Sequence, residues 1–576
     1  MGRDQARGPL WARRTIAGAG RASAPSTPGE SPLGDSGGSA VDVMTSRAGA
    51  GRADPGVPTP GTFALDPGWV ARLREFAVAS PRAQTMDTVT PMTGRVLARL
   101  PVSSGDDVQL AFDGARAVRP SWEALPVHLR AEVFGRFHDL VLDHQVELLD
   151  LIQLESGKAR AHAFDEIVDV AQVCRYYAAV APALLAPKRL PGLLPVLTRV
   201  EELRHPRGVV GVVAPWNYPL SMAITDVIPA LLAGNAVVLR PDPQTSLTAL
   251  LCADLLARAG LPPRVLQVVL GPGPTTGADV LAQADYVAFT GSSATGRLVA
   301  RDAGARLVGA SLELGGKNAM YVAADADLDR AAEGAVRACF TSAGQLCISI
   351  ERLLLHEAIA ADFLDRFIPR VEALRLGTNL TYDADLGSLV SQAQLGRVQA
   401  HVDGAVEAGA LVLTGGRARP DIGPWFFEPT VLDRVPREAA VCREETFGPV
   451  VSVYRVGSDA EAIAAANDTG YGLSASVFTR DAERGRRIAA AIRCGSVNVN
   501  DGFGAAYASV AAPMGGMKAS GVGRRHGEEG LLKYTESQTI AVQRLVPLGA
   551  PDGVSGQTMA TGATVLLRVL KALGRG

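Results

Sequence analysis

The chain has 576 residues, which corresponds to three or four domains at about 150 residues each. Residues 1–60 hold 11 glycines and 7 prolines but few large aliphatic side chains. Such a segment cannot offset the entropy cost of its own ordering, so we expect residues 1–62 to form a disordered N-terminal extension. With 57 basic and 59 acidic residues the net charge is −2. No Lys/Arg-rich block favours nucleic acid as the partner, which leaves a small-molecule site as the default.

The N-terminal residues also bear on location. Several arginines occur there without an apolar stretch, which excludes an ordinary secretory signal, and interspersed acidic residues argue against a transit peptide. No uninterrupted apolar run reaches the length of about 18 residues that a spanning helix needs. We therefore expect a cytoplasmic protein. The six cysteines form no CxxC pair and the histidines no HExxH motif, so we expect neither a disulfide framework nor a metal site.

The middle of the chain changes from helical to strand-rich patterns. Helical periodicity extends from about residue 106 to 185, and a Pro-rich, hairpin-like stretch follows at 187–207. Short, continuous apolar runs, each about one helix apart, then predict strands of a parallel sheet that is buried on both faces. These runs are residues 209–216, 236–241, 265–271 and 286–291.

This alternation predicts an α/β fold with a doubly wound parallel sheet. A second α/β region follows from about residue 316 to 515, and a short strand-like segment comes after it at 537–546. Ligands of doubly wound sheets bind at the carboxyl ends of the strands. The loops that begin at the ends of the apolar runs, at Ala214, Arg240, Gly271 and Thr290, are therefore the candidate ligand edge.

Two polar residues near this edge are candidates for chemistry. Asn217 follows the first run in APWNYP, and its amide can stabilise an oxyanion without carrying charge. Taken alone, a turn-forming asparagine is the more common explanation. Glu313 lies in LELGGK before two glycines that let a ligand approach the backbone, and its carboxylate can activate water. A salt bridge at a strand end explains it equally well.

Cys347 is the candidate nucleophile. It follows a glycine-containing turn in AGQLCI, and a position at a helix N-terminus or beside cofactor charge would favour its thiolate. For any single cysteine the alternative is a buried, inert thiol.

Two glycine-rich loops are candidate phosphate sites. GPGPTTG (271–277) is not the GxGxxG fingerprint, because its third glycine comes one residue late. FTGSSATG (289–296) follows an expected strand and opens an expected helix, whose first N–H groups suit a pyrophosphate. A plain strand-to-helix turn is the alternative.

Taken together, these segments resemble the aldehyde dehydrogenase superfamily. PWNYP, FTGSSATG, ELGGK, GQLC, EETFGPV (444–450) and PMGGMKASGVGR (513–524) occur in that family's order and spacing, including the 34 residues from Glu313 to Cys347. The resemblance covers about residues 63–546. ACFTSAGQLCISIER, GVGRRHGEEGLLKYTESQTIA and RPDIGP most resemble the actinobacterial NADP-type succinate-semialdehyde dehydrogenases.

The resemblance implies a role for each matched residue. Cys347 would attack the aldehyde, Asn217 and the Cys347 backbone N–H would hold the oxyanion, and Glu313 would activate the water that hydrolyses the thioester. The presence of Glu313 argues against a CoA-acylating member. The implied NAD(P) site comprises Pro215, Trp216, Arg240, Asp242, Gly291, Ser292, Leu314, Glu445 and Phe447.

One departure from the family concerns the cofactor. Many members have Lys-Pro-x-Glu after the second strand, where the glutamate binds the adenosine ribose and repels a 2′-phosphate. This chain has Arg240-Pro-Asp242-Pro243. A guanidinium binds phosphate in a bidentate way, so we expect NADP to be preferred over NAD, although Asp242 opposes that preference.

Other departures concern the substrate. A lysine of many relatives is replaced by Asp226, so the resemblance does not imply a proton relay at this position. The two arginines with which well-known succinate-semialdehyde dehydrogenases bind the substrate carboxylate are replaced by Thr225 and Thr341. Burying a carboxylate without a cation is costly. The best prediction is succinate semialdehyde, with an apolar medium-chain or aromatic aldehyde as the alternative.

The resemblance also implies a domain organisation. Residues 63–186 and 208–315 would form the cofactor-binding domain, 316–530 the catalytic domain, and 187–207 with 531–548 a small β extension for oligomerisation. Exposed edges of such a small sheet predict a homodimer or homotetramer. The rival functions are a thioester-forming or esterase activity at the same cysteine and a non-catalytic scaffold.

The tail 549–576 is expected to form a short amphipathic helix. Leu566, Val569, Leu570 and Leu573 follow helical spacing, with basic residues nearby. Packing on a neighbouring subunit is the more common explanation of such a pattern, and a weak peripheral membrane contact is the alternative.

Overall fold

The computed structural model describes residues 63–192, 198–544, 549, 553–572 and 574. The expected disordered extension 1–62 and Leu573 of the tail pattern lie outside the described residues. The first elements are α1 (Pro67–Arg74) and the antiparallel pair β1 (Thr85–Val89) and β2 (Val96–Pro101).

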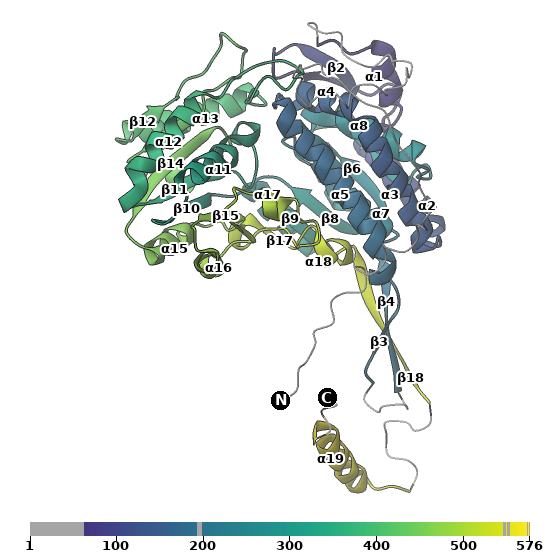
Figure 1. The fold of residues 1–576 in the computed structure, drawn as a ribbon. Coiled ribbons are helices and arrows are strands. Elements are labelled where there is room, and N and C mark those ends of the chain that lie inside the picture. The colour runs from purple at the N-terminus through teal and green to yellow at the C-terminus, as the bar shows by residue number, and fades with distance from the viewer. Residues whose placement is uncertain (1–62, 193–197, 545–548, 550–552, 573, 575–576) are drawn as a thin grey trace, which may run out of the picture. The chain divides into compact units, whose positions relative to one another are not determined.

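Six strands form the first sheet, in the order β17-β9-β8-β5-β6-β7 (Figure 1). The strands β5 to β9 pair in parallel, which confirms the four apolar runs as strands of one parallel sheet. Their bounds are β5 (Val209–Val213), β6 (Ala236–Arg240), β7 (Leu266–Val268), β8 (Tyr286–Thr290), β9 (Gly309–Glu313) and β17 (Gly521–Val522).

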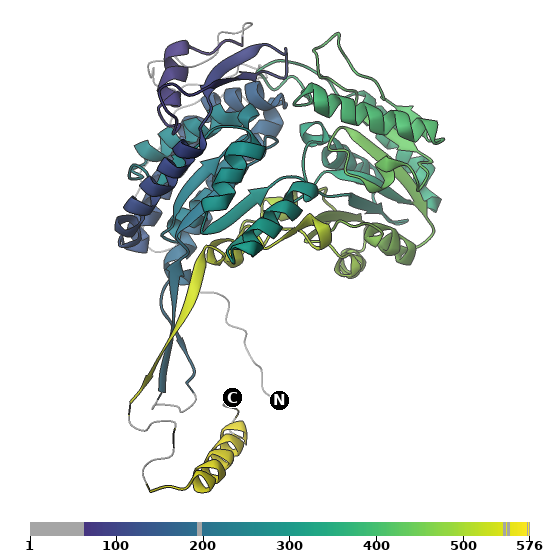
Figure 2. The same ribbon diagram turned by 180° about the vertical axis from the view of Figure 1, so that it is seen from behind.

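Helices cover both faces of this sheet, which is why its strands are continuously apolar. Val210 and Val212 of β5 pack into the cluster formed by α3 to α8, whereas Val209 and Val213 pack into the cluster with α2, α9 and α10. Figures 1 and 2 view the sheet from opposite sides. The bounds are α2 (Gly105–Glu123), α3 (Val127–Asp143), α4 (Gln145–Ser156), α5 (Arg160–Leu184), α6 (Pro219–Ile224), α7 (Val227–Leu232), α8 (Ser246–Arg258), α9 (Ala278–Gln283) and α10 (Ser293–Ala305).

The edge strand β17 departs from the expected division of the chain. It comes from the segment 316–530 that we assigned to the catalytic domain, but Gly521 pairs with Glu313 and Val522 with Leu312 in the first sheet. A strand of two residues has no periodicity from which it could be predicted.

The second sheet has seven strands in the order β12-β13-β14-β11-β10-β15-β16, with only β12 antiparallel to its neighbour. α11, α12 and α13 pack on one face, and α15 and α16 on the other. The bounds are β10 (Asn318–Val322), α11 (Leu328–Phe340), β11 (Ile350–His356), α12 (Ala360–Glu372), α13 (Gln392–Glu407), β12 (Leu411–Thr414), β13 (Thr430–Asp433), α14 (Ala440–Arg443), β14 (Val450–Val456), α15 (Asp459–Asn467), β15 (Ser474–Phe478), α16 (Ala482–Ala491), β16 (Ser496–Val499), α17 (Gly504–Tyr507) and α18 (Gly527–Leu532).

A third sheet contains β3 (Lys188–Leu190), β4 (Thr198–Pro206) and β18 (Thr535–Gln543), all antiparallel. The sheet thus pairs the hairpin-like stretch expected at 187–207 with the strand-like segment expected at 537–546. The tail forms the helix α19 (Gly556–Ala572), whose apolar side chains Val565, Leu566, Leu567 and Val569 are exposed. In the part of the chain that the structure describes, no helix has the length and apolar character to cross a membrane.

Candidate active site

Ten of the predicted site residues line one cavity of about 180 Å³. It lies at the carboxyl ends of β5, β8 and β9, against the loops that precede β11 and β14 of the second sheet. The ten are Pro215, Trp216, Asn217, Gly291, Ser292, Glu313, Leu314, Cys347, Glu445 and Phe447. We call this space the reaction cavity. Arg240 and Asp242 are not among the residues that line it.

A tight turn precedes Cys347. Ser342, Ala343 and Gly344 have φ angles of 53°, 53° and 69°, which is a left-handed conformation that costs energy for residues other than glycine. The Ser342 N–H donates to His162 Nδ1 at 3.1 Å, and its hydroxyl donates to the Tyr218 oxygen at 3.1 Å. These contacts hold the strained turn in place.

Amide side chains fix the backbone around the thiol. Asn318 Nδ2 donates to the carbonyl oxygens of Cys347 at 2.7 Å and of Ser349 at 2.8 Å. Asn217 Nδ2 donates to the Gln345 carbonyl at 3.0 Å, which leaves its second amide hydrogen for the reaction cavity. α6 follows Asn217 directly, and its first N–H groups, those of Leu220 and Ser221, donate to the buried Glu166 carboxylate.

The surroundings of Cys347 differ from one expectation. Cys347 lies in the loop between α11 and β11, and not at the N-terminus of a helix. Burial and the carboxylates Glu313 and Glu445 raise the pKa of its thiol to about 12, whereas Arg525 lowers it. A helix terminus therefore contributes nothing to the thiolate, and the side chain that favours it is a buried guanidinium.

Glu313 ends β9, where its backbone pairs with Thr290 and Gly521. Burial raises the pKa of its carboxyl to about 7, although Arg525 and Lys533 act to lower it. Within the described residues its Oε1 atom is buried without a hydrogen-bond partner. A carboxylate with this pKa is well placed to take a proton from water near neutral pH.

The other end of the reaction cavity is aromatic and rich in N–H groups. Trp216 and Phe447 meet edge to face with ring centroids 5.5 Å apart. Glu445 accepts a hydrogen bond of 2.7 Å from the Gly316 N–H. Ser292, which lines the cavity, caps α10 by accepting a hydrogen bond from the Thr295 N–H. A Cβ atom at Gly291 would lie 2.7 Å from the Phe289 ring, so any other residue there would require the ring to shift.

Arg240 lies beside the loop after β7. Its Nε donates to the Gly271 carbonyl at 2.9 Å, and Nη1 is 3.9 Å from Asp242 Oδ2. Asp242 accepts a hydrogen bond from the Gln244 N–H at 3.0 Å. Arg240 is therefore oriented by a backbone carbonyl and only loosely paired with Asp242.

Several residues of the reaction cavity were missed by the sequence reasoning. Arg525 is the most consequential, because it is a buried cation beside Cys347 and Glu313. It directly follows the motif PMGGMKASGVGR, so extending the motif by one residue was the available signal. The others are Met222, Gln394, Arg397, Leu473 and Met514, whereas Thr290 and Gly315 belong to segments that the sequence already placed at the ligand edge.

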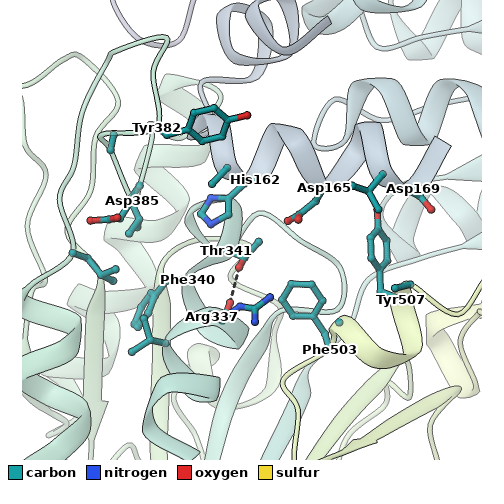
Figure 3. Close-up of a pocket in the computed structure, with 18 of the residues that line it drawn as sticks. His162, Asp165, Asp169, Arg337, Phe340, Thr341, Tyr382, Asp385, Phe503 and Tyr507 are labelled. Carbon is teal, nitrogen blue, oxygen red and sulfur yellow. Dashed lines mark hydrogen bonds between the residues drawn. The ribbon is translucent and has the colours of Figure 1, made fainter. Parts of the chain in front are cut away.

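A second cavity, of about 540 Å³ (Figure 3), shares no lining residue with the reaction cavity. His162, Asp165 and Asp169 come to it from α5, and Arg337 and Thr341 from the end of α11. We call it the α5–α11 cavity. Arg337 is the one Lys or Arg among its lining residues, all of which belong to the described part of the chain.

Comparison with known proteins identifies the family. The model of the aldehyde dehydrogenase family matches residues 78–540. The chain belongs to the aldehyde dehydrogenase family. This confirms the resemblance that the motifs indicated and the predicted fold class.

Individual relatives of this aldehyde dehydrogenase are similar over most of their length. A Mycolicibacterium smegmatis protein named "Putative succinate-semialdehyde dehydrogenase, NADP(+)" is 52% identical over 481 residues, which are 84% of this chain and 93% of that protein. The crystal structure of an Escherichia coli NADP-dependent enzyme has a TM-score of 0.78 at 34% identity and covers 81% of this chain and 96% of its own. The NAD+ complex of a Bacillus cereus aldehyde dehydrogenase has a TM-score of 0.78 at 33% identity, with 83% and 99% covered.

The turn before Cys347 generates a prediction about Gly344. A Cβ atom at Gly344 would overlap the Gly448 carbonyl, and the φ of 69° is itself unfavourable for alanine. We expect Gly344→Ala to lower the free energy of unfolding by at least roughly 1–3 kcal/mol and to abolish activity, measured by denaturation and steady-state assay. Gly396→Ala, in α13 with open space around it, is the control and should not destabilise the protein. Wild-type stability of Gly344→Ala would show that the turn is not constrained.

Proposed function

We propose that this aldehyde dehydrogenase oxidises succinate semialdehyde to succinate, with NADP preferred over NAD, in the cytoplasm. The observation that carries the proposal is the convergence of Cys347, Glu313 and Asn217 on one cavity with the predicted cofactor residues. The names of the M. smegmatis and E. coli proteins support the choice of substrate and of cofactor.

The first step uses Cys347. Its Sγ bonds to the aldehyde carbon as the thiol proton passes to water, and the carbonyl oxygen becomes the oxyanion of a thiohemiacetal. The free amide hydrogen of Asn217 and the backbone N–H of Cys347 donate to this oxyanion. Asn217 is buried and anchored to the Gln345 carbonyl, so little reorganisation accompanies the donation.

The reaction cavity fits a dinucleotide at its aromatic end. The N–H groups that open α10 suit a pyrophosphate, the glycine at 291 permits close approach, and Trp216 and Phe447 supply flat apolar surface. When bound there, the nicotinamide of NADP or NAD supplies the chemistry of hydride acceptance. Glu445 is placed to accept a hydrogen bond from a ribose hydroxyl.

The last step uses Glu313. Its carboxylate takes a proton from a water molecule, the hydroxide oxygen bonds to the thioester carbon, and the bond from carbon to Sγ breaks. The products are the carboxylic acid and free Cys347. The unpartnered Oε1 atom of Glu313 leaves an acceptor available for that water.

An uncharged aldehyde is the second candidate substrate. The observation in its favour concerns Thr225 and Thr341, which replace the expected arginines. Each hydroxyl donates to the backbone carbonyl four residues earlier, so neither position supplies a cation for a carboxylate. An esterase or thioester-forming activity would use the same Cys347, whereas a non-catalytic scaffold would leave the buried thiol and carboxylate without a role.

The role of Glu313 predicts both a trapped intermediate and a pH dependence. Because the pKa of Glu313 is about 7, its protonated form predominates at lower pH and cannot accept a proton, so turnover should fall about tenfold per pH unit well below that value. Glu313→Gln should lower kcat by about 100-fold or more and accumulate acyl-enzyme, detected by mass spectrometry after a burst of reduced cofactor. Unchanged kcat in Glu313→Gln would overturn the assignment of Glu313 as the base.

Full aldehyde oxidation by Cys347→Ser would overturn the assignment of Cys347 as the nucleophile.

The position of Arg240 predicts the cofactor preference. Its hydrogen bond to the Gly271 carbonyl uses Nε, which leaves Nη2 and Nη1, the latter 3.9 Å from Asp242 Oδ2, to bind a 2′-phosphate. We expect Arg240→Gln to lower kcat/KM for NADP by about tenfold or more while kcat/KM for NAD, the internal control, changes little. A wild-type enzyme that favours NAD tenfold would reject the preference for NADP.

We further propose a homodimer or homotetramer formed through the third sheet and a weak peripheral membrane contact through α19. β18 and β3 are the outer strands of that sheet, and unpaired strand edges favour association. α19 carries exposed apolar side chains together with Arg568 and Lys571.

Deletion of residues 561–576 tests whether α19 contacts a membrane or a neighbouring subunit. Loss of co-sedimentation with anionic liposomes at unchanged molar mass by light scattering is the expected result. A smaller molar mass with unchanged liposome binding would assign α19 to the subunit interface instead.

A further inference from the structure

The proposed substrate has a carboxylate that needs a cation near Cys347. When the aldehyde carbon is bonded to Sγ, the carboxylate carbon is three bonds away, which corresponds to about 4 Å when extended. A cation that lines the reaction cavity is therefore the first candidate to bind it. Among the described residues lining that cavity only Arg397 and Arg525 are Lys or Arg.

Arg397 is unsuited to this task. Its Nη2 donates to the Glu445 carbonyl at 2.5 Å, which ties it to the predicted cofactor end of the cavity. Its side chain is also exposed, so water screens its charge. Arg525, in contrast, is only 5% exposed.

The Arg525 guanidinium contacts three residues of the segment 222–226. Its Nη2 donates to the Thr225 hydroxyl at 2.6 Å and is 3.0 Å from Asp226 Oδ2, and its Nη1 contacts the weak acceptor Met222 Sδ at 3.0 Å. Thr225 is one of the two positions where an arginine was expected. A guanidinium from a segment 300 residues later in the chain thus lies against that position.

The charges around Arg525 leave it able to bind an anion. Asp226 pairs with both Arg525 and, at 2.9 Å, Lys533, so this buried group of three has two positive charges and one negative. Asp226 also accepts a hydrogen bond from the Tyr534 hydroxyl at 2.7 Å. Glu313 and Asp169 add negative charge nearby, but within the described residues Glu313 Oε1 has no hydrogen-bond partner, and Asp169 lies 3.8 Å from His526 Nε2.

We propose that Arg525 is the specificity-determining residue that binds the carboxylate of the aldehyde substrate, in place of the arginines missing at Thr225 and Thr341. The inference rests on the proposed oxidation of succinate semialdehyde at Cys347. The Nε–H and Nη1 hydrogens, which have no oxygen acceptor within the described part of the chain, are the donors. The contacts with Asp226 and Thr225 orient the guanidinium before the substrate binds.

Arg525 also affects the chemistry that all aldehydes share, since it lowers the pKa of both Glu313 and Cys347. A loss of kcat alone would therefore not separate substrate binding from electrostatic support. The ratio of kcat/KM for succinate semialdehyde to kcat/KM for butanal removes the shared part, because the two aldehydes have four carbons each and differ in the carboxylate.

The test measures this ratio in Arg525→Gln. We expect it to fall by about 10- to 100-fold, the effect of losing hydrogen bonds to a charged group, mainly through a higher KM for succinate semialdehyde. Arg337→Gln, which removes the cation of the α5–α11 cavity, is the matched control and should leave the ratio unchanged. The double variant Thr225→Arg with Arg525→Gln should recover part of the preference. Thermal melting confirms that each variant is folded.

Each outcome is decisive. A wild-type preference for succinate semialdehyde that survives in Arg525→Gln, or that is lost in Arg337→Gln instead, overturns the role of Arg525. A wild-type enzyme that oxidises butanal as efficiently as succinate semialdehyde rejects the proposed substrate, a result that does not depend on any variant. If Arg525→Gln does not fold, Arg525→Lys keeps the charge but not the planar fork. It must then raise KM for succinate semialdehyde more than KM for butanal, and equal effects on both overturn the inference.

Discussion

The burial of ionisable side chains in the reaction cavity is the constraint on which the rest of the site depends. Burial raises the pKa of Glu313 and Glu445 to about 7 and that of Cys347 to about 12. The same burial strengthens the effect of a nearby cation, because charges interact more strongly away from water. Arg525 is that cation, and it opposes the effect of burial on both Glu313 and Cys347.

A network of backbone contacts keeps these groups at their places. The left-handed turn before Cys347 is held by His162 and Tyr218, and the loop after it by Asn318. On the opposite side, pairing of β9 with β8 and β17 holds Glu313. Cys347 precedes a strand of the second sheet, whereas Glu313 ends a strand of the first. The distance between the thiol and the carboxylate therefore depends on how these two segments meet at the reaction cavity.

Much of the fold could be predicted because its signals are local. The four apolar runs have the composition of strands covered on both faces, and each forms a parallel strand. The edge strand Gly521–Val522 could not be predicted, because two residues have no period. The helical periodicity of residues 106–185 likewise does not reveal the break at His144, where α3 ends and α4 begins without a proline or glycine.

The sequence by itself determined the family and the residue types of the site, since Asn217, Glu313 and Cys347 stand in motifs whose order and spacing are visible along the chain. Only the tertiary structure decided the electrostatics of that site. Asp226 and Arg525 are 299 positions apart, and their ion pair of 3.0 Å exists only because α18 and the segment before it pack against α7. A sequence records which charges are present, but pKa values and cation positions depend on burial and on distances between remote segments.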